Sequence, residues 1–261
     1  MPFKKIEPER VSDAITRQIE ALILRGVLRP GERLPAEREL ATKLGASRPS
    51  LRDALADLEE RGLIITRPGS GAFVAEVLGS AFAPPLIALF ATHQEAFFDY
   101  LSFRRDLEGL AAERAARFAT PTDLEVIDAV FKRMEAAHGL RNPEREAELD
   151  VEFHMAIVEA AHNVVMMHMM RSMFELLKNG VFYNRRLLFG VRDTRDTLLD
   201  HHRAVHGAIM ARDPARARAE LENHLGFIEE SMREHLRRAA LEETARLRQS
   251  QLMSTGSGTR R

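Results

Sequence analysis

The placement of glycine and proline constrains this fold more than any other feature of the sequence. In residues 1–76 they separate short apolar segments, whereas residues 93–236 contain few turn signals and a nearly continuous helical pattern. The predicted fold class is mainly α, with a helical bundle in the C-terminal part. The sequence divides into a small N-terminal domain at 1–76, a linker at 77–95, an all-helical domain at 96–238 and a frayed or disordered tail at 239–261.

Composition excludes several classes of protein. With 45% hydrophobic residues among 261, the chain can build one large domain or two ordinary ones. Its 38 basic and 39 acidic residues give a net charge of -1, so an anionic partner must be met by a local patch. The absence of cysteine excludes disulfides and thiolate metal sites. Without a secretory signal, and with a longest apolar stretch that is short and contains Pro84, we expect a cytoplasmic protein without a membrane span.

The first domain has the pattern of a winged helix-turn-helix. Apolar residues recur at helical spacing over 11–23, a short helix is expected at 36–44, and Ser47 is placed to cap a further helix. Two apolar segments at 63–66 and 72–74 then flank a glycine-rich turn, which predicts a hairpin. Two short helices joined by a tight turn and followed by a hairpin are typical of DNA-binding modules.

Four polar residues of this domain are candidates for DNA binding. Arg48 and Arg52 lie one helical turn apart, opposite the apolar face of the expected second helix. At the N-terminal part of a recognition helix, such guanidinium forks reach base edges in the major groove. Ser50 and Arg38 are placed to contact phosphates. The same pattern also fits a solvated charged face, but the expected wing favours DNA binding.

Two segments carry a family resemblance. The runs LRPGERLPAERELA at 28–41 and SRPSLRDAL at 47–55 resemble the signature of the GntR family of bacterial transcription regulators. The rest of the chain resembles the all-helical effector (FCD) domain of its FadR-type branch. The resemblance implies a dimeric repressor rather than an enzyme, bound to palindromic double-stranded operator DNA. It also implies that residues matching the family's operator contacts bind DNA here, namely Arg38, Arg48, Arg52 and Gly69.

Arg104 falls on the apolar stripe of the helix expected at 97–118. A guanidinium facing a core needs an anion, because burial of an unpaired charge is prohibitive. Glu108, one turn along, offers a structural ion pair. A ligand carboxylate is the second candidate, and the resemblance favours this effector-binding role for Arg104.

Four more polar residues face inward in the same projection: Asp150, His154, His202 and His224. Together they suit Zn²⁺ or another divalent ion such as Ni²⁺ or Mn²⁺. Taken singly, each histidine is more often a core residue, and helices distant in sequence need not converge. Metal-binding members of the FadR-type branch have an Asp and three His at matching positions, so the resemblance implies a metal centre. For His206 an orienting role, an extra ligand role and a core-edge position all stay open.

The resemblance implies that a small carboxylate releases the repressor from DNA. Segments 159–165 and 224–230 resemble a pyruvate-responsive member of the branch, which indicates pyruvate or a related 2-oxo or 2-hydroxy acid. One alternative is a DNA-binding sensor whose effector is the metal ion. Another is a metal-dependent hydrolase, but the chain lacks His-Glu-x-x-His spacing and the N-terminal domain would stay unexplained.

Overall fold

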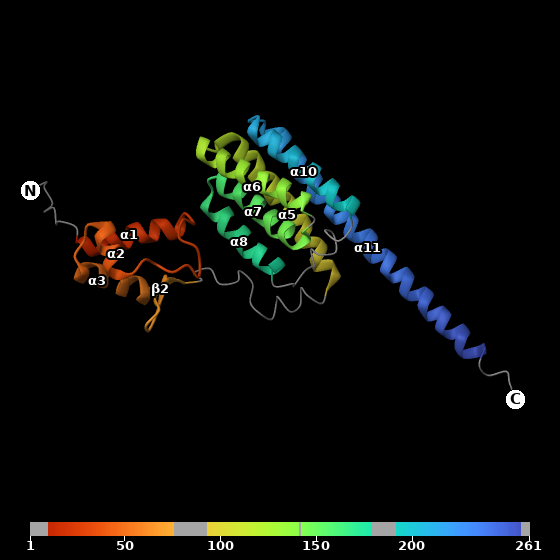
Figure 1. The fold of residues 1–261 in the computed structure, drawn as a ribbon, viewed down its shortest axis with the longest axis horizontal. Coiled ribbons are helices and arrows are strands. Elements are labelled where there is room, and N and C mark those ends of the chain that lie inside the picture. The colour runs from red at the N-terminus through yellow and green to blue at the C-terminus, as the bar shows by residue number, and fades with distance from the viewer. Residues whose placement is uncertain (1–9, 76–92, 141, 179–191, 257–261) are drawn as a thin grey trace, which may run out of the picture. The chain divides into compact units, whose positions relative to one another are not determined.

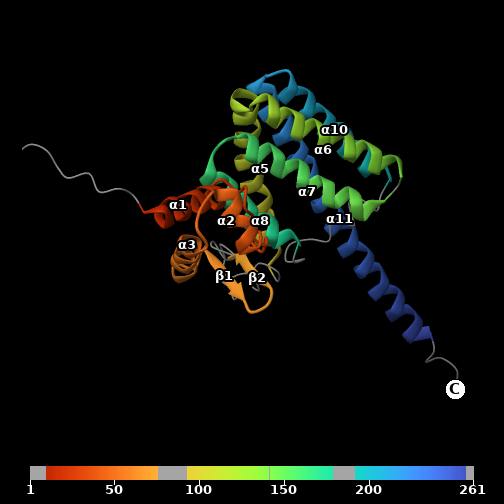
Figure 2. The ribbon, with the colours of Figure 1, turned by 60° about the vertical axis from the view of Figure 1, so that its left-hand side comes forward.

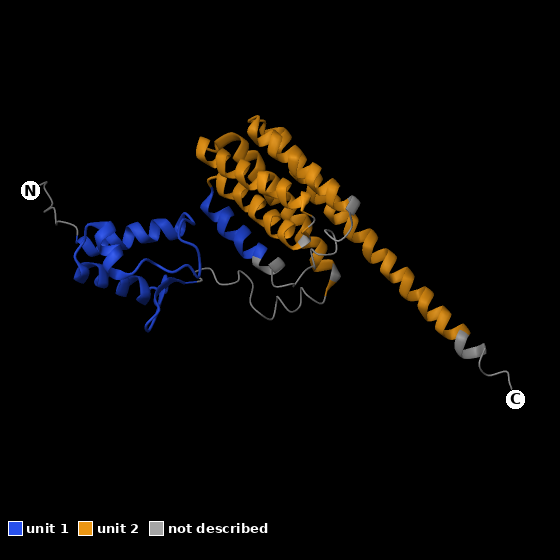
Figure 3. Ribbon diagram, viewed as in Figure 1, with its two compact units in different colours: residues 1–84, 163–176 blue, residues 85–162, 177–261 orange. Residues whose placement is uncertain are grey.

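The structure is a computed structural model that describes residues 10–75, 93–140, 142–178 and 192–256 (Figure 1). The chain divides into two compact units, one of residues 1–84 and 163–176, the other of residues 85–162 and 177–261 (Figure 3). The described part is almost wholly helical apart from one two-stranded sheet, which confirms the predicted mainly α fold class. In these ranges we find no helix with the length and apolar character needed to cross a membrane.

The N-terminal part of the first unit is a winged helix-turn-helix (Figure 2). Gly45, with a φ of 61°, ends the first helix of the motif, and Ser47 caps the second by accepting a hydrogen bond from the backbone N of Ser50 at 3.2 Å. In the antiparallel hairpin, Ile64 pairs with Val74 and Arg67 with Gly71. The elements are α1 (Val11–Leu24), α2 (Glu37–Leu44), α3 (Arg48–Glu60), β1 (Ile64–Arg67) and β2 (Gly71–Val74).

The tip of the wing requires glycine. The backbone N of Ser70 donates to the carbonyl of Arg67 at 2.9 Å, and Gly69 has a φ of 72°. This is the pattern of a type II turn, whose third residue needs a positive φ. An apolar core under the turn and helices holds the motif together, formed by Ile15, Ile19, Ile23, Leu34, Ala41, Leu51, Ala54, Leu58, Ile64 and Val74.

One helix of the effector domain expected at 96–238 is grouped with the winged motif in the structure. This is α8 (Val164–Lys178), of which residues up to 176 group with the winged motif. Its His168 Nε2 lies 2.8 Å from the carbonyl of Leu24, and Arg171 Nη2 donates to the carbonyl of Gly26 at 3.2 Å. Polar side chains of α8 thus satisfy carbonyls at the C-terminus of α1, where cations are favoured. The sequence did not predict these contacts of α8, because helical periodicity does not reveal which neighbour a helix packs against.

The second unit is a helical bundle. Its helices are α5 (Gln94–Phe118), α6 (Pro121–Gly139), α7 (Pro143–Ala160), α10 (Arg192–Met210) and α11 (Pro214–Gly256). Helix α5 packs along α11 and α7, and α10 packs against α11 and α6 (Figure 1). Small residues of α5, such as Ala112 and Ala115, allow the neighbouring helices to pack close to α5 and leave room for larger side chains. The largest side chains of this core include Phe131, Phe153, Ile157, Ile209 and Leu221.

The expected domain ends differ from the structure. Helix α11 continues to Gly256, so the tail predicted to fray at 239–261 is helical as far as residue 256, with exposed side chains over 237–252. Ion pairs one turn apart support this segment, between Arg238 and Glu234 at 2.6 Å and between Arg246 and Glu242 at 3.1 Å. Most of the linker predicted at 77–95 lies outside the described residues, and α5 begins within it, at Gln94.

Candidate metal centre and DNA-binding surface

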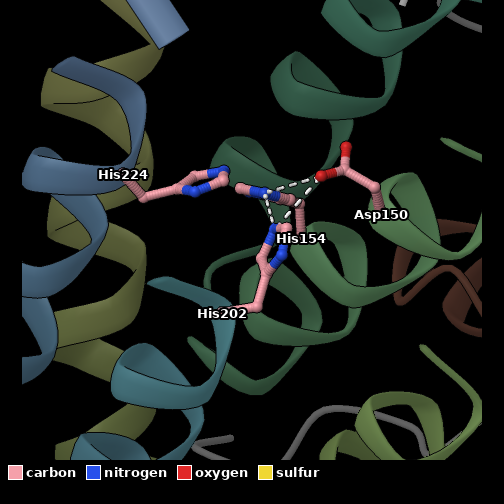
Figure 4. A group of neighbouring side chains, drawn as sticks. All are labelled: Asp150, His154, His202 and His224. Atoms are coloured by element: carbon pink, nitrogen blue, oxygen red, sulfur yellow. Dashed lines mark hydrogen bonds and ion pairs between the residues drawn. The ribbon is translucent and has the colours of Figure 1, made fainter. Parts of the chain in front are cut away.

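Three helices of the bundle direct polar side chains to one buried point (Figure 4). Asp150 and His154 lie one turn apart on α7, His202 comes from α10 and His224 from α11. One donor atom from each residue lies within 4.8 Å of the others, and all four side chains are buried. The four residues selected from the sequence as metal ligands are therefore neighbours in the structure.

The donor atoms of this group, which we call the Asp/His group, face one another. Asp150 Oδ1 lies 3.1 Å from His202 Nε2 and 3.8 Å from His154 Nε2. The two Nε2 atoms are 3.4 Å apart (Figure 4). Two histidines directed at the same carboxylate oxygen form the kind of cluster that a cation can join.

His224 gives an independent reason to expect a cation. Neither of its ring nitrogens has a hydrogen-bond partner among the described residues, although both are buried. Burial, and then the neighbouring His202 and His154, lowers the pKa of His224 well below its usual range. A buried neutral imidazole with no partner is costly, and a metal ion would bind one of its nitrogens. The residues present therefore fit a metal ion with one oxygen and three nitrogen ligands, as Zn²⁺, Ni²⁺ or Mn²⁺ accepts.

A buried ion pair adjoins the Asp/His group. Arg104 and Glu108 are 3% and 1% exposed, and Arg104 Nε donates to Glu108 Oε1 at 2.5 Å. The second oxygen of Glu108 contacts Nδ1 of His154. Burial by itself would raise the pKa of Glu108, but Arg104 and His154 lower it to about 2. Burial would also lower the pKa of Arg104, yet Glu108 raises it above its usual value. The structural pair, one of the two interpretations of Arg104, is thus present, and binding of a ligand carboxylate stays a prediction.

Two other histidines of α10 lie outside the Asp/His group. His206 Nε2 is 3.1 Å from Asp128 Oδ1, and its ring stacks on Phe131 with centroids 4.4 Å apart. The ring centroid of His201 is 6.0 Å from that of His224, and burial lowers the pKa of His201. His206 is therefore a bundle residue paired with α6, and not one of the converging donors.

The recognition-helix arginines are exposed and held together by a residue that the sequence analysis missed. Arg52 Nε lies 2.9 Å from Glu37 Oε2, and Arg48 Nη2 lies 3.9 Å from the same oxygen. Their side chains are 61% and 59% exposed. Glu37 is on α2, so its contact with two residues of α3 depends on the turn between the helices. Sequence spacing carries no signal for a contact of that kind.

The remaining DNA-binding candidates are at other positions of the winged motif. Arg38 is exposed on α2, and Gly69 is exposed at the wing tip. Ser50 is partly buried, with its hydroxyl 2.9 Å from that of Ser47 at the start of α3. The structure places all five candidates on the winged motif, and their contacts with DNA stay predictions.

Comparison with known proteins gives two family matches and a shared fold. The gntR family model of bacterial regulatory proteins matches residues 11–74, and the FCD domain model matches residues 99–227. The putative L-lactate dehydrogenase operon regulatory protein of Escherichia coli K12 is 37% identical over 230 residues, covering 87% of this chain and 88% of the relative. The Glc operon transcriptional activator of the same organism is 33% identical over 247 residues, covering 91% and 97%.

A solved structure, Streptococcus agalactiae GntR, covers 84% of this chain and 99% of its own with a TM-score of 0.51. At 22% identity this likeness shows the fold. The identity to the lactate operon regulator extends through both the winged motif and the helical bundle. The chain belongs to the GntR family of bacterial regulatory proteins, in the FadR-type branch whose winged helix-turn-helix is joined to an FCD domain.

Proposed function

We propose that the protein is a transcription repressor in the cytoplasm, and not an enzyme. It binds a palindromic operator as a homodimer and is released by a small carboxylate, pyruvate or a related 2-oxo or 2-hydroxy acid. The observation that carries this proposal is the buried Asp/His group beside Arg104 in a chain that also presents Arg48 and Arg52 on a winged motif. The Asp/His group with Arg104 provides a site for a small anion, and the winged motif presents positively charged side chains to DNA.

The Asp/His group would hold one divalent ion through Asp150, His154, His202 and His224. A bound ion would act as a Lewis acid toward the oxygens of the acid. Charge supports an anionic ligand at this place. A divalent ion and ionised Asp150 leave one positive charge, while Arg104 and Glu108 neutralise each other. A monocarboxylate balances the remaining charge, whereas a dicarboxylate adds an uncompensated negative charge in a buried site.

Arg104 is the residue that we assign to the carboxylate of the acid. Its planar guanidinium presents N–H donors in a fork, which suits the planar carboxylate group of the acid. The name of one relative refers to an L-lactate dehydrogenase operon, and lactate is a 2-hydroxy monocarboxylate. This agrees with the charge argument for a small acid bearing one carboxylate.

A hydrolase is the weaker alternative. Hydrolysis would need a general base beside the ion. Glu108 contacts the Asp/His group from outside, but Arg104 and His154 already share its oxygens. Hydrolysis would also leave the exposed arginines of α3 without a role.

Operator binding by metal-loaded protein tests the proposal, measured by fluorescence anisotropy with pyruvate, L-lactate, the dicarboxylate succinate, and added metal without acid. We expect a monocarboxylate to weaken DNA binding by about 5–150-fold, the usual range of coupling between two sites. Succinate should have a smaller effect. Release by added metal without acid would favour the metal sensor, and the absence of release by any monocarboxylate would contradict the effector assignment.

Arg104→Lys supplies the matched variant. Lysine keeps a cation for Glu108 but lacks the planar fork. Its operator affinity without acid should equal that of the wild type, whereas release should need more acid. An unchanged response would leave Arg104 with the structural role alone.

A further inference from the structure

The Asp/His group is supported from outside by one carboxylate. Glu108 on α5 is 1% exposed and contacts Nδ1 of His154 on α7 through Oε2. Its other oxygen, Oε1, accepts from Arg104 Nε at 2.5 Å. A buried guanidinium therefore compensates the charge of Glu108, so the carboxylate can stay ionised in the apolar bundle. An ionised carboxylate accepts hydrogen bonds and donates none.

That property determines which nitrogen of His154 carries a proton. Because an ionised Glu108 only accepts, Nδ1 of His154 must donate to it, which leaves Nε2 as the ring nitrogen that can present a lone pair to an ion. Nε2 is the atom directed at the group, 3.4 Å from His202 Nε2 and 3.8 Å from Asp150 Oδ1. A metal ligand must present a lone pair, so the contact with Glu108 selects the ring form that can bind an ion.

We propose that Glu108 is the positioning residue of the metal centre, and that Arg104 holds the Glu108 side chain in place through its contact with Oε1. This role rests on the proposed function, since it assumes that the Asp/His group binds a divalent ion. It differs from a purely structural ion pair, which would stabilise the bundle without any preference for one ring form of His154. The two roles predict different properties for the metal centre.

Glu108→Gln tests the role, because glutamine keeps the size of the side chain and removes its charge. The probes are Zn²⁺, titrated against a chromophoric chelator, and Co²⁺, whose visible absorption reports ligand geometry. We expect about 10–100-fold weaker metal binding, the usual effect of removing such a partner, together with a changed Co²⁺ spectrum. In the Zn²⁺-loaded wild type, nitrogen NMR of the histidine rings should show a proton on Nδ1 of His154 and metal on Nε2.

Glu113→Gln is the matched control, since Glu113 is on the same helix but pairs with Arg117 and Arg218 at 3.3 Å each. It should bind both metals as the wild type does. If Glu108→Gln does not fold because the carboxylate beside Arg104 is lost, the double variant Arg104→Met/Glu108→Gln removes both charges and gives the same measurements.

Unchanged zinc affinity and an unchanged cobalt spectrum in the folded Glu108 variant would overturn the positioning role and leave Glu108 as a counter-ion of Arg104. Metal on Nδ1 of His154 in the wild type would overturn it equally. A wild-type protein that binds neither ion would overturn the metal centre itself, which distinguishes failure of the proposed function from failure of this inference.

Discussion

The two units of this protein use charged side chains in opposite ways. In the winged motif, Arg48 and Arg52 are 59% and 61% exposed and lie outside an apolar core. In the bundle, Arg104, Glu108 and the Asp/His group are buried among the core side chains themselves. The first arrangement adds a binding surface to a fold that is already complete. The second makes the proposed ligand site part of the fold.

This difference determines how each region should respond to mutation. An exposed ion pair such as that of Arg52 with Glu37 contributes little to stability, because water solvates both partners when the pair is broken. A buried charge that loses its partner stays in a medium that does not solvate it. Function and stability should therefore be separable in the winged motif and coupled in the bundle.

The largest expected effect is that of removing the metal. Chelation should lower the free energy of unfolding by about 4 kcal/mol if the free ion was present at about 1,000 times its dissociation constant. The double variant His202→Ala/His224→Ala should lose the ion, about one per chain by elemental analysis of untagged protein. His206→Ala is the control, because His206 lies on the same helix and pairs with Asp128. Equal loss of metal in His206→Ala would show that the ligands were assigned wrongly.

The loss of Arg104 should have an effect of comparable size. Arg104→Ala leaves Glu108 buried without its guanidinium, so we expect a loss of about 3–5 kcal/mol in urea unfolding. Arg105→Ala removes the adjacent arginine, which is 37% exposed and pairs with Glu229 at 3.3 Å. That change should cost less than about 1 kcal/mol. Similar losses for both variants would contradict the coupling of charge and stability in the bundle.

In the winged motif, we expect loss of an arginine to weaken DNA binding and to leave stability nearly unchanged. Arg48→Ala and Arg52→Ala should each weaken specific operator binding by about 1–3 kcal/mol, because each removes a fork that pairs with base edges. Their free energies of unfolding should stay within about 0.5 kcal/mol of the wild type. Arg246→Ala removes the same charge from an exposed position on α11 and should leave DNA binding unchanged. A gel shift with unaltered affinity in both arginine variants would remove α3 as the recognition helix.

The sequence predicts the fold and much of the proposed ligand site for a physical reason. Helical periodicity identifies which residues face a core, so Arg104 and His154 stand out as polar residues in apolar stripes. Periodicity does not show how helices are arranged around one another. The contact of Glu108 with His154 depends on α5 packing against α7, and that of Glu37 with Arg52 on the turn before α3. The assignment of α8 to the winged unit escaped prediction for the same reason.

The smallest effect concerns a polar surface feature of the bundle. At the start of α6, Asp123 Oδ2 accepts from the backbone N of Thr120 at 2.7 Å, and the Thr120 hydroxyl accepts from the backbone N of Asp123 at 3.2 Å. His162 lies 2.9 Å from the same carboxylate oxygen. Asp123 belongs to the bundle but lies at its surface. If a charge affects function only when it is buried, Asp123→Asn should lower the free energy of unfolding by about 1 kcal/mol and leave metal binding intact.

The effect of Asp123→Asn on stability should depend on pH, because the Asp123 carboxyl group titrates. Partial burial by itself would raise the pKa of Asp123, but the Thr120 hydrogen bonds and His162 lower it below its usual value. The folded state therefore holds its proton less tightly than the unfolded state, whose pKa is about 3.9. The stability difference between wild type and Asp123→Asn should be complete well above that pH and shrink as the pH falls through the folded-state pKa. Urea unfolding of the wild type and Asp123→Asn between acid and neutral pH measures this difference. A difference that grew toward acid pH would show that the cap does not stabilise the ionised carboxylate.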